Sequence, residues 1–304
     1  MTDQKTLSSR AWMELLLLAA IWGASFAAIR IALDELGPLT VVAHRVGWAM
    51  LALWAVVWWR RLPLPRDARV WFAFLMMGLL NNAIPFGLMA WGQLHIASGL
   101  TAILNAATAI FGVLMAALFF ADERLTPRKV MGVTLGFAGV ATAIGLENLR
   151  NFDLRALAQL AVIAGTVSYA LASVWGRKRL GDQPPLVAAA GMLTGGTVIL
   201  LPLAWAIEGP ITLDLAPRTW GAIAYVGLIS TALAYLLYYR VLAMAGSGNL
   251  MLVTLLVPPF AITLGAWLLE ETLYASAFAG FGLLVTGMII LDGRIWRLWA
   301  KRAR

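Results

Sequence analysis

Ten stretches of mostly apolar residues follow one another along this chain, and they constrain its fold more than any other feature. A helix needs about 20 apolar residues to cross a bilayer, and backbone groups inside lipid must be hydrogen-bonded internally. The sequence therefore predicts an all-α integral membrane protein with ten transmembrane helices. The stretches cover residues 12–33, 38–59, 69–93, 97–120, 128–146, 154–176, 184–207, 217–242, 247–269 and 273–292.

Composition supports a membrane protein and excludes several functions. Hydrophobic residues make up 62% of the chain and charged residues only 12%, whereas soluble domains are about 25% charged. With no cysteine, two histidines and no carboxylate pair within a stretch, neither a metal site nor an acid–base pair is easily assembled. We therefore expect no enzyme, no cofactor and no bound metal. The net charge of +8 does not indicate nucleic-acid binding, because the basic residues cluster in short loops at one membrane face.

The basic residues predict the orientation. With the N-terminus placed in the cytoplasm, the inner segments hold eighteen Lys and Arg residues and the outer segments hold three. This asymmetry follows the positive-inside rule and places both termini in the cytoplasm. Lys5 and Arg10 precede an apolar run as in a signal peptide, but the run is long and further stretches follow it. We interpret it as a retained first span.

The chain repeats itself with a period near 149 residues. The segment 69–71 matches 218–220, both with Arg first and Trp third, and Ser98-Gly99 matches Ser247-Gly248. Each half then holds five spans, and an odd number forces the second half to insert upside down. We expect a first five-helix repeat over 1–147 and a second, inverted repeat over 148–304. Inverted repeats place a site at their interface that opens alternately to each side.

Short motifs resemble a known family. Each half ends in a similar way, with Ala121-Asp122-Glu123-Arg124-Leu125 in the first and Glu270-Glu271-Thr272-Leu273 in the second. Together with Trp22-Gly23-Ala24-Ser25-Phe26, these residues resemble the EamA type of the drug/metabolite transporter superfamily, and within it the YddG-type exporters of aromatic and other amino acids. The resemblance implies a ten-helix metabolite exporter of the bacterial inner membrane. The chain departs from the family at Ala109, where a proline is common.

Charged residues inside the predicted spans are few. All fifteen acidic residues lie in loops or near span ends, with Glu14 the deepest. Proton-coupled carriers usually need an embedded carboxylate, so we expect facilitative transport. Arg45 lies within the second span, and two interpretations remain open. It either binds helix-end carbonyls, Glu270 or Glu271 as a structural strut, or it attracts a substrate carboxylate.

Polar and aromatic side chains recur at helical spacing in several spans. Thr101, Asn105 and Thr108 are separated by four and three residues, which places them on one helix face. Such faces predict the wall of a cavity, and the alternative is hydrogen bonding between helices, worth about 0.6 kcal/mol per pair. The residues predicted to line a substrate cavity are Trp22, His44, Arg45, Asn81, Asn82, Phe86, Gln93, Thr101, Asn105, Thr108, Ser168, Tyr169, Thr231, Tyr235 and Tyr238.

Prolines and glycines complete the prediction. Pro258 and Pro259 each lack a backbone donor and should kink the ninth span, and Pro85 is their counterpart in the first half. Broken helices near a repeat interface often mark a gate, so these prolines are predicted hinges. The glycines of the fifth and tenth spans, at 132, 136, 139, 280 and 287, should allow those two helices to approach closely.

These features favour a small zwitterionic solute. The predicted cavity is aromatic and uncharged apart from one arginine, whereas a phosphate compound would need several cations. We therefore expect a monomer in the lipid bilayer that exports amino acids, aromatic ones included, by facilitative alternating access. The main alternative is a broad-specificity drug or metabolite efflux pump coupled to protons. A passive channel and a membrane enzyme are weaker alternatives.

Overall fold

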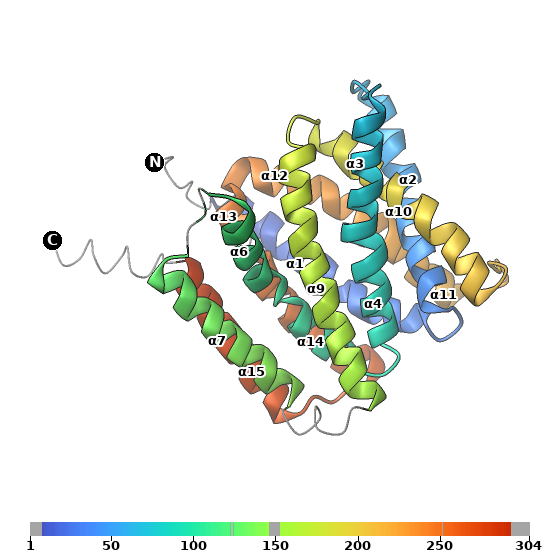
Figure 1. Ribbon diagram of the computed structural model, residues 1–304. Coiled ribbons are helices and arrows are strands. Elements are labelled where there is room, and N and C mark those ends of the chain that lie inside the picture. Colours follow the sequence, from blue (N-terminus) through green and yellow to red (C-terminus); the bar gives the residue numbers. More distant parts are fainter. Residues whose placement is uncertain (1–7, 122, 124, 146–152, 251, 293–304) are drawn as a thin grey trace.

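The computed structural model describes residues 8–121, 123, 125–145, 153–250 and 252–292, and all the regular structure in these ranges is helical. Each of the ten predicted stretches contains a helix, and four of them are divided (Figure 1). The helices are α1 (Ser9–Ala32), α2 (Pro38–Trp59), α3 (Ala68–Gly78), η1 (Leu79–Ala83), α4 (Ile84–Gly92), α5 (Ser98–Asn105), α6 (Thr108–Phe119), α7 (Pro127–Ile144), α9 (Leu154–Arg179), α10 (Pro185–Glu208), α11 (Pro217–Ala224), η2 (Tyr225–Leu233), α12 (Ala234–Ala245), α13 (Ser247–Leu250), α14 (Val253–Leu269) and α15 (Ala275–Asp292).

The helices form a multi-span membrane protein. Seven of the described helical segments are long and apolar enough to cross a bilayer, and the apolar segments Val253–Leu269 and Ala275–Leu291 are shorter. Many large apolar side chains are exposed, with Trp58 85% and Trp267 77% accessible, which lipid would cover. The all-helical membrane fold is thus confirmed, whereas the count of ten crossings and the cytoplasmic termini remain predictions.

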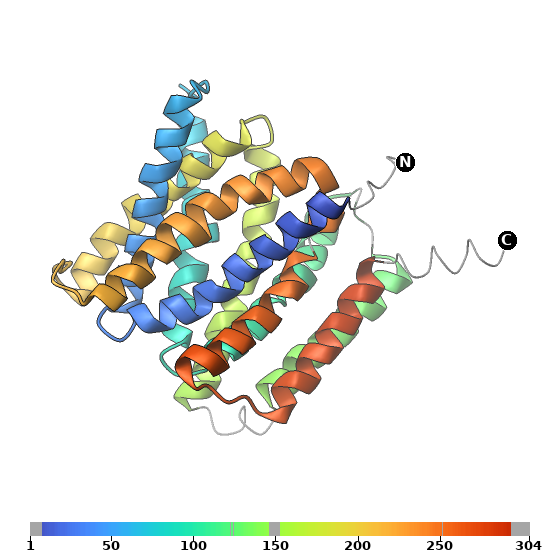
Figure 2. The ribbon, with the colours of Figure 1, turned by 180° about the vertical axis from the view of Figure 1, so that it is seen from behind.

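The bundle has two chemically different ends. The start of α1 and the end of α15 lie on the same side (Figures 1 and 2). We call this side the basic end, because Arg60 and Arg66, which follow α2, and Arg128, in the first turn of α7, also lie there. The opposite side is called the acidic end, after Glu35, Glu208 and Glu271 in its loops and helix ends.

The packing of the spans is symmetric between the two halves. Three contacts join a span to its predicted counterpart: α2 with α10, α7 with α15, and α5 with α14. Several others occur in pairs: α1 packs on α14 as α9 packs on α6, and α4 packs on α9 as α12 packs on α1. This is the pattern expected if a two-fold axis relates the halves.

The pair α7 and α15 is held by glycines and lies at one edge of the bundle (Figures 1 and 2). A Cβ added at Gly132 would lie 2.7 Å from the carbonyl oxygen of Gly287, and one at Gly280 would lie 2.5 Å from that of Gly139. No side chain fits at such distances, so the backbones meet directly. The predicted close approach of these two helices is confirmed.

Two π-helical segments interrupt the spans at matching places. η1 begins at Leu79, and adding the repeat period of 149 gives 228, which lies inside η2. Each extra residue in a π-helix turns the helix face and loosens local backbone pairing, and such segments are frequent at functional sites. In η2, the Thr231 hydroxyl donates to the carbonyl of Val226, five residues earlier, at 2.8 Å.

Candidate functional site

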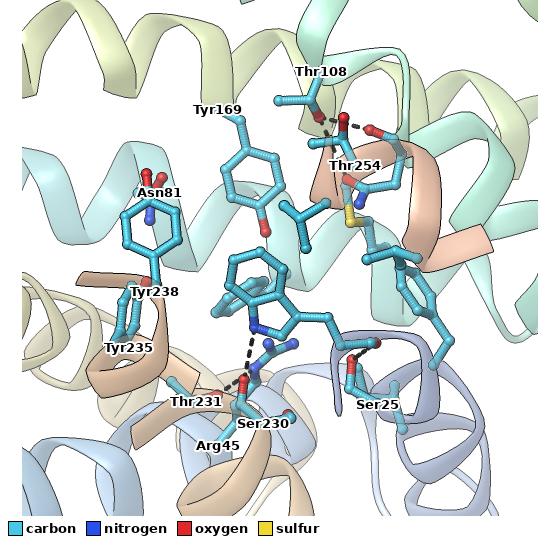
Figure 3. A pocket seen from close by; sticks show the side chains of 18 of the residues that line it. Ser25, Arg45, Asn81, Thr108, Tyr169, Ser230, Thr231, Tyr235, Tyr238 and Thr254 are labelled. Atoms are coloured by element: carbon cyan, nitrogen blue, oxygen red, sulfur yellow. Dashed lines mark hydrogen bonds between the residues drawn. The ribbon is translucent and has the colours of Figure 1, made fainter. Parts of the chain in front are cut away.

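A cavity of about 480 Å³ lies among α1, α2, α4, α9, α12 and α14 (Figure 3). Its volume falls in the range of small-molecule sites. Its walls come from both halves of the chain, as expected for a site at a repeat interface. The lining residues are Trp22, Ser25, Phe26, Ile29, Arg45, Met77, Asn81, Phe86, Met89, Gln93, Asn105, Thr108, Tyr169, Ser173, Met192, Ser230, Thr231, Tyr235, Tyr238, Tyr239, Leu250, Val253, Thr254 and Val257.

Arg45 is the one charged residue of this lining. Its side chain comes from the buried face of α2, and the residue is only 8% exposed. Nε donates to the Thr231 hydroxyl at 3.0 Å, and the guanidinium carbon lies 3.7 Å from the centroid of the Phe86 ring. The predicted partners Glu270 and Glu271 are not the ones observed, because Arg45 binds Thr231 of η2 and Glu271 binds Ser98. A structural role and a role in binding a substrate carboxylate both remain open.

Aromatic rings form much of the cavity wall (Figure 3). Phe86 meets Tyr169 edge-on at a centroid distance of 6.2 Å, and Trp22 lies 6.0 Å from Tyr238. The indole nitrogen of Trp22 donates to the carbonyl of Ser230 at 3.1 Å, which links α1 to η2. Tyrosine and tryptophan offer an apolar face with a polar edge, so this wall suits a planar apolar group.

Neutral polar groups complete the lining. The amide of Asn81 donates to the sulfur of Met192 at 3.2 Å, and the Thr108 hydroxyl donates to the carbonyl of Asn105 at 2.8 Å. Both polar atoms of the Gln93 amide are buried and find no hydrogen-bond partner among the described residues. A buried polar group without a partner is costly, so Gln93 is available to a ligand or to water.

The exposed fraction of the lining residues differs between the two ends of the cavity. Toward the acidic end, lining residues are buried: Ser25 is 4% exposed and Gln93 is 1% exposed. Toward the basic end the lining is mixed: Ser173 is exposed and Met77 and Tyr239 are partly exposed, whereas Leu250 and Val253 are buried. The cavity is therefore covered at the acidic end and accessible toward the basic end.

Carboxylates fasten the acidic end together by capping helices of other spans. Glu208, at the end of α10, accepts from the backbone N–H groups of Leu39 and Thr40 at 2.8 Å each. Glu271 accepts from the backbone and hydroxyl of Ser98, at 2.9 and 2.7 Å. A carboxylate at a helix N-terminus is favoured by the free N–H groups and by the helix dipole.

A third carboxylate, that of Glu35, caps α11 in the same way. It accepts from the Ala216 backbone at 3.0 Å and from the Thr219 hydroxyl at 2.6 Å. The hydrogen bond from Thr219 and, to a smaller extent, the one from Ala216 lower the pKa of Glu35 below its ordinary value of 4.5. Three spans at this end thus depend on carboxylates that other spans supply.

Eleven of the fifteen predicted cavity residues line the cavity. They are Trp22, Arg45, Asn81, Phe86, Gln93, Asn105, Thr108, Tyr169, Thr231, Tyr235 and Tyr238. Their contact with a substrate remains a prediction.

The other four predicted cavity residues pack between helices instead. His44 meets the ring of Trp220 edge-on. Asn82 is fully buried and donates to the Met192 carbonyl at 3.3 Å. The other two use their hydroxyls on backbone carbonyls: Thr101 on that of Ala97, and Ser168 on that of Leu80. These four residues are not among the described residues that line the cavity in this structure.

Sequence reasoning missed part of the lining. Ser25, Ser173 and Ser230 were not selected, although Ser25 follows Trp22 by three residues and Ser230 precedes Thr231. Helical spacing could have found Ser25, but serine is common in packed membrane helices, so its presence alone is a weak signal. The apolar lining, such as Val253 and Val257, has no polar signal at all.

The predicted hinges do not break their helix. α14 runs from Val253 to Leu269 through Pro258 and Pro259. Each proline removes one donor, but the turns on either side keep their own hydrogen bonds. The interruptions lie instead between Asn105 and Thr108, between Leu250 and Val253, and at η1 and η2. Pro85 lies directly after η1, at the start of α4, so the first-half prediction is close to an interruption, and a role in gating remains a prediction.

Among the residues that the structure describes, the lining contains no Asp, Glu, His or Lys. Within the described ranges, no group of three or more His, Cys, Asp or Glu residues could hold a metal ion. Glu14, the deepest acidic residue, lies outside the cavity and pairs with Arg240 and Arg10 near the basic end. The cavity is thus suited to bind a neutral or anionic organic solute.

The fold and the site define a class: a multi-span helical protein with one central cavity between two similar halves is a membrane transporter. Comparison with known proteins gives the family. The model of the EamA-like transporter family matches residues 10–145 and 156–291. The chain belongs to this family of transporters and is not an enzyme.

Individual relatives are distant but cover the whole chain. A probable terminal-alkyne amino-acid exporter from Streptantibioticus cattleyicolor is 27% identical over 293 residues, 95% of each chain. A probable amino-acid metabolite efflux pump from Escherichia coli (strain K12) is 24% identical, over 94% of this chain and 96% of the pump. A crystal structure with 18% identity matches with a TM-score of 0.66, over 94% of this chain and 98% of the other, and shows the fold alone.

Proposed function

We propose that this transporter exports small zwitterionic metabolites, amino acids and especially aromatic ones, across the bacterial inner membrane as a monomer. The observation that carries the proposal is the cavity lining, which combines one unpaired arginine with aromatic rings and neutral polar groups. An amino acid offers a carboxylate for the guanidinium and a side chain for the rings. Two relatives named for amino-acid export support the same class.

Alternating access is the mechanism that we propose. The cavity is covered at the acidic end and accessible toward the basic end. The positive-inside rule predicts that the basic end faces the cytoplasm. An exporter in this state loads substrate from inside. The symmetric packing of the halves supports a second state in which the acidic end opens. Reaching that state requires the carboxylate caps at the acidic end to release their helices.

Transport is proposed to be facilitative. A carrier driven by protons needs a group that takes up a proton when substrate leaves, and an embedded carboxylate is the usual choice. None lines the cavity. The same absence disfavours lipophilic cations, which an efflux pump for drugs would have to bind.

Counterflow in proteoliposomes tests the proposal. Vesicles loaded with unlabelled phenylalanine should accumulate labelled phenylalanine in a saturable manner, equally with and without a pH gradient. Ser173→Trp places an indole at an exposed cavity position and should abolish the exchange. Gly221→Trp is the matched control, because Gly221 is exposed and a Cβ atom added there would meet no atom within 4 Å. Absence of exchange with every amino acid tested would refute the substrate class, and exchange that needs a pH gradient would refute facilitative transport.

A further inference from the structure

We infer that Arg45 makes the substrate carboxylate indispensable and leaves the ammonium group dispensable. The cavity would then accept aromatic monocarboxylates and N-acylated amino acids as well as free amino acids. This inference deepens the proposed function and rests on it, since it assigns the chemical group by which the same cavity selects its substrate.

The guanidinium of Arg45 uses only one of its hydrogen-bond donors on the described residues. A guanidinium carries five N–H donors, and one of them, Nε–H, binds Thr231 at 3.0 Å. The terminal amino groups have no hydrogen-bond partner among the described residues, and the Phe86 ring covers one face of the group. Figure 3 shows the guanidinium of Arg45 beside the Thr231 side chain, at the cavity. Its free edge presents donors suited to the two oxygens of a carboxylate.

The positive charge of Arg45 has no counter-charge beside it among the described residues. Arg45 is 8% exposed, so its charge is largely removed from water. No Asp or Glu lines the cavity, and no carboxylate lies within salt-bridge distance of Arg45 in the described ranges. A buried charge without a counter-charge is strongly unfavourable. The carboxylate of a ligand would supply the missing charge, so binding should depend steeply on it.

The ammonium group of a bound amino acid would meet no carboxylate among the described lining residues. With no acidic side chain in the lining, only neutral acceptors can receive it, such as Asn81, Asn105 and the tyrosine hydroxyls. An ammonium group that enters this lining exchanges hydrogen bonds with water for hydrogen bonds with neutral groups and gains no counter-charge, so the net gain in binding free energy is small. Removing or acylating the amino group should therefore weaken binding only slightly.

The experiment compares four ligands of wild-type protein in detergent, where leakage across a membrane plays no part. Thermal stabilisation is titrated with phenylalanine, 3-phenylpropionate, N-acetylphenylalanine and phenethylamine. We expect 3-phenylpropionate and N-acetylphenylalanine to bind within about tenfold of phenylalanine. Phenethylamine, which lacks the carboxylate, should bind at least about 100-fold more weakly. Phenethylamine binding as well as phenylalanine, or loss of binding by both amine-blocked acids, would overturn the inference.

Variants of Arg45 locate the effect. Arg45→Gln should abolish stabilisation by 3-phenylpropionate, and Arg45→Lys should restore part of it, since the charge returns without the paired donors. Arg30→Gln is the control, because Arg30 pairs with Asp34 and lies outside the cavity lining. Unchanged stabilisation in a folded Arg45→Gln protein would refute the role of Arg45. If that variant does not fold, the ligand series on wild-type protein still decides.

Counterflow separates this inference from the proposed function. If phenylalanine exchanges but 3-phenylpropionate neither competes nor stabilises, the inference fails and the amino-acid exporter stands. If no amino acid exchanges but 3-phenylpropionate stabilises wild-type protein and not Arg45→Gln, the carboxylate site stands and the proposed substrate fails.

Discussion

The two ends of the bundle cap their helices in different ways. At the basic end, α1, α3 and α7 are capped from within their own segment: Ser8 accepts from Ala11, Asp67 from Arg69, and Thr126 from Lys129. At the acidic end, α9 is also capped from its own segment, by Asp153, but α2, α5 and α11 receive their caps from other spans. Helices at the basic end can therefore separate with their caps intact, whereas opening the acidic end uncaps three helices.

This difference explains the state of the cavity. Each cap between spans holds two helices together and satisfies backbone donors that have no other partner. The acidic end is consequently the closed side, and Ser25 and Gln93 beneath it are buried. Opening it would cost about 1 kcal/mol per cap if water replaces the carboxylate poorly, an amount that substrate binding or helix repacking can offset.

The largest effect is expected from removing two of these caps together. Glu208→Ala combined with Glu271→Ala should lower the free energy of unfolding by about 2 kcal/mol, because the two caps are independent and each contributes about 1 kcal/mol. It should also make a thiol introduced at Ser25 in the cavity accessible to a labelling reagent from the acidic end. Chemical denaturation of the purified protein measures the first effect. Asp214→Ala, an exposed carboxylate at the same end, should change neither property, and equal behaviour of the two proteins would refute the role of the caps.

A smaller effect is expected at the basic end. Glu14 of α1 pairs with Arg240 of α12, which is the one ion pair between these two spans among the described residues, and the Arg240 side chain is 54% exposed. Glu14→Gln should lower the free energy of unfolding by less than about 1 kcal/mol, as for other partly exposed pairs. It should leave the acidic end closed, as judged by thiol labelling. A change in the accessible side would mean that the basic end also controls the state.

The smallest effect is a pH dependence at the acidic end. Since its hydrogen bonds lower the pKa of Glu35 in the folded protein below 4.5, its stabilising contribution is complete above that value. The contribution is lost as the pH falls through the lower folded-state pKa. The difference in melting temperature between wild type and Glu35→Gln should be constant from neutral pH to about pH 5 and shrink in more acidic buffer. A difference that already shrinks near neutral pH would contradict the assignment.

The sequence predicted the helices well because hydrocarbon length and backbone hydrogen bonding leave few alternatives. Helical spacing also found most of the cavity wall. It failed where the spacing itself changes: η1 turns Asn82 toward α10 and leaves Asn81 at the cavity. Spacing alone also does not give depth: Thr101 shares α5 with Asn105 but lies one turn nearer the acidic end, where it is fully buried and its hydroxyl donates to the carbonyl of Ala97.

Neighbouring residues and distant partners were the other difficulty. Ser168 and Tyr169 are adjacent, yet only Tyr169 lines the cavity, because consecutive helix residues point about 100° apart. The caps by Glu35, Glu208 and Glu271 join residues more than 160 positions apart, such as Glu208 with Leu39 at a separation of 169. Nothing in the local pattern of a loop carboxylate indicates which helix it caps.

The proposed alternating access depends most directly on a cavity that is open to the basic end and closed at the acidic end. Because the chain has no cysteine, single thiols can be placed at Ser173→Cys and Ser25→Cys on a clean background. Each is labelled with a membrane-impermeant thiol reagent in vesicles of either orientation. The account predicts that Ser173→Cys reacts at least about tenfold faster from the basic end, and that Ser25→Cys is protected from the acidic end. Faster reaction of both thiols from the acidic end would contradict it.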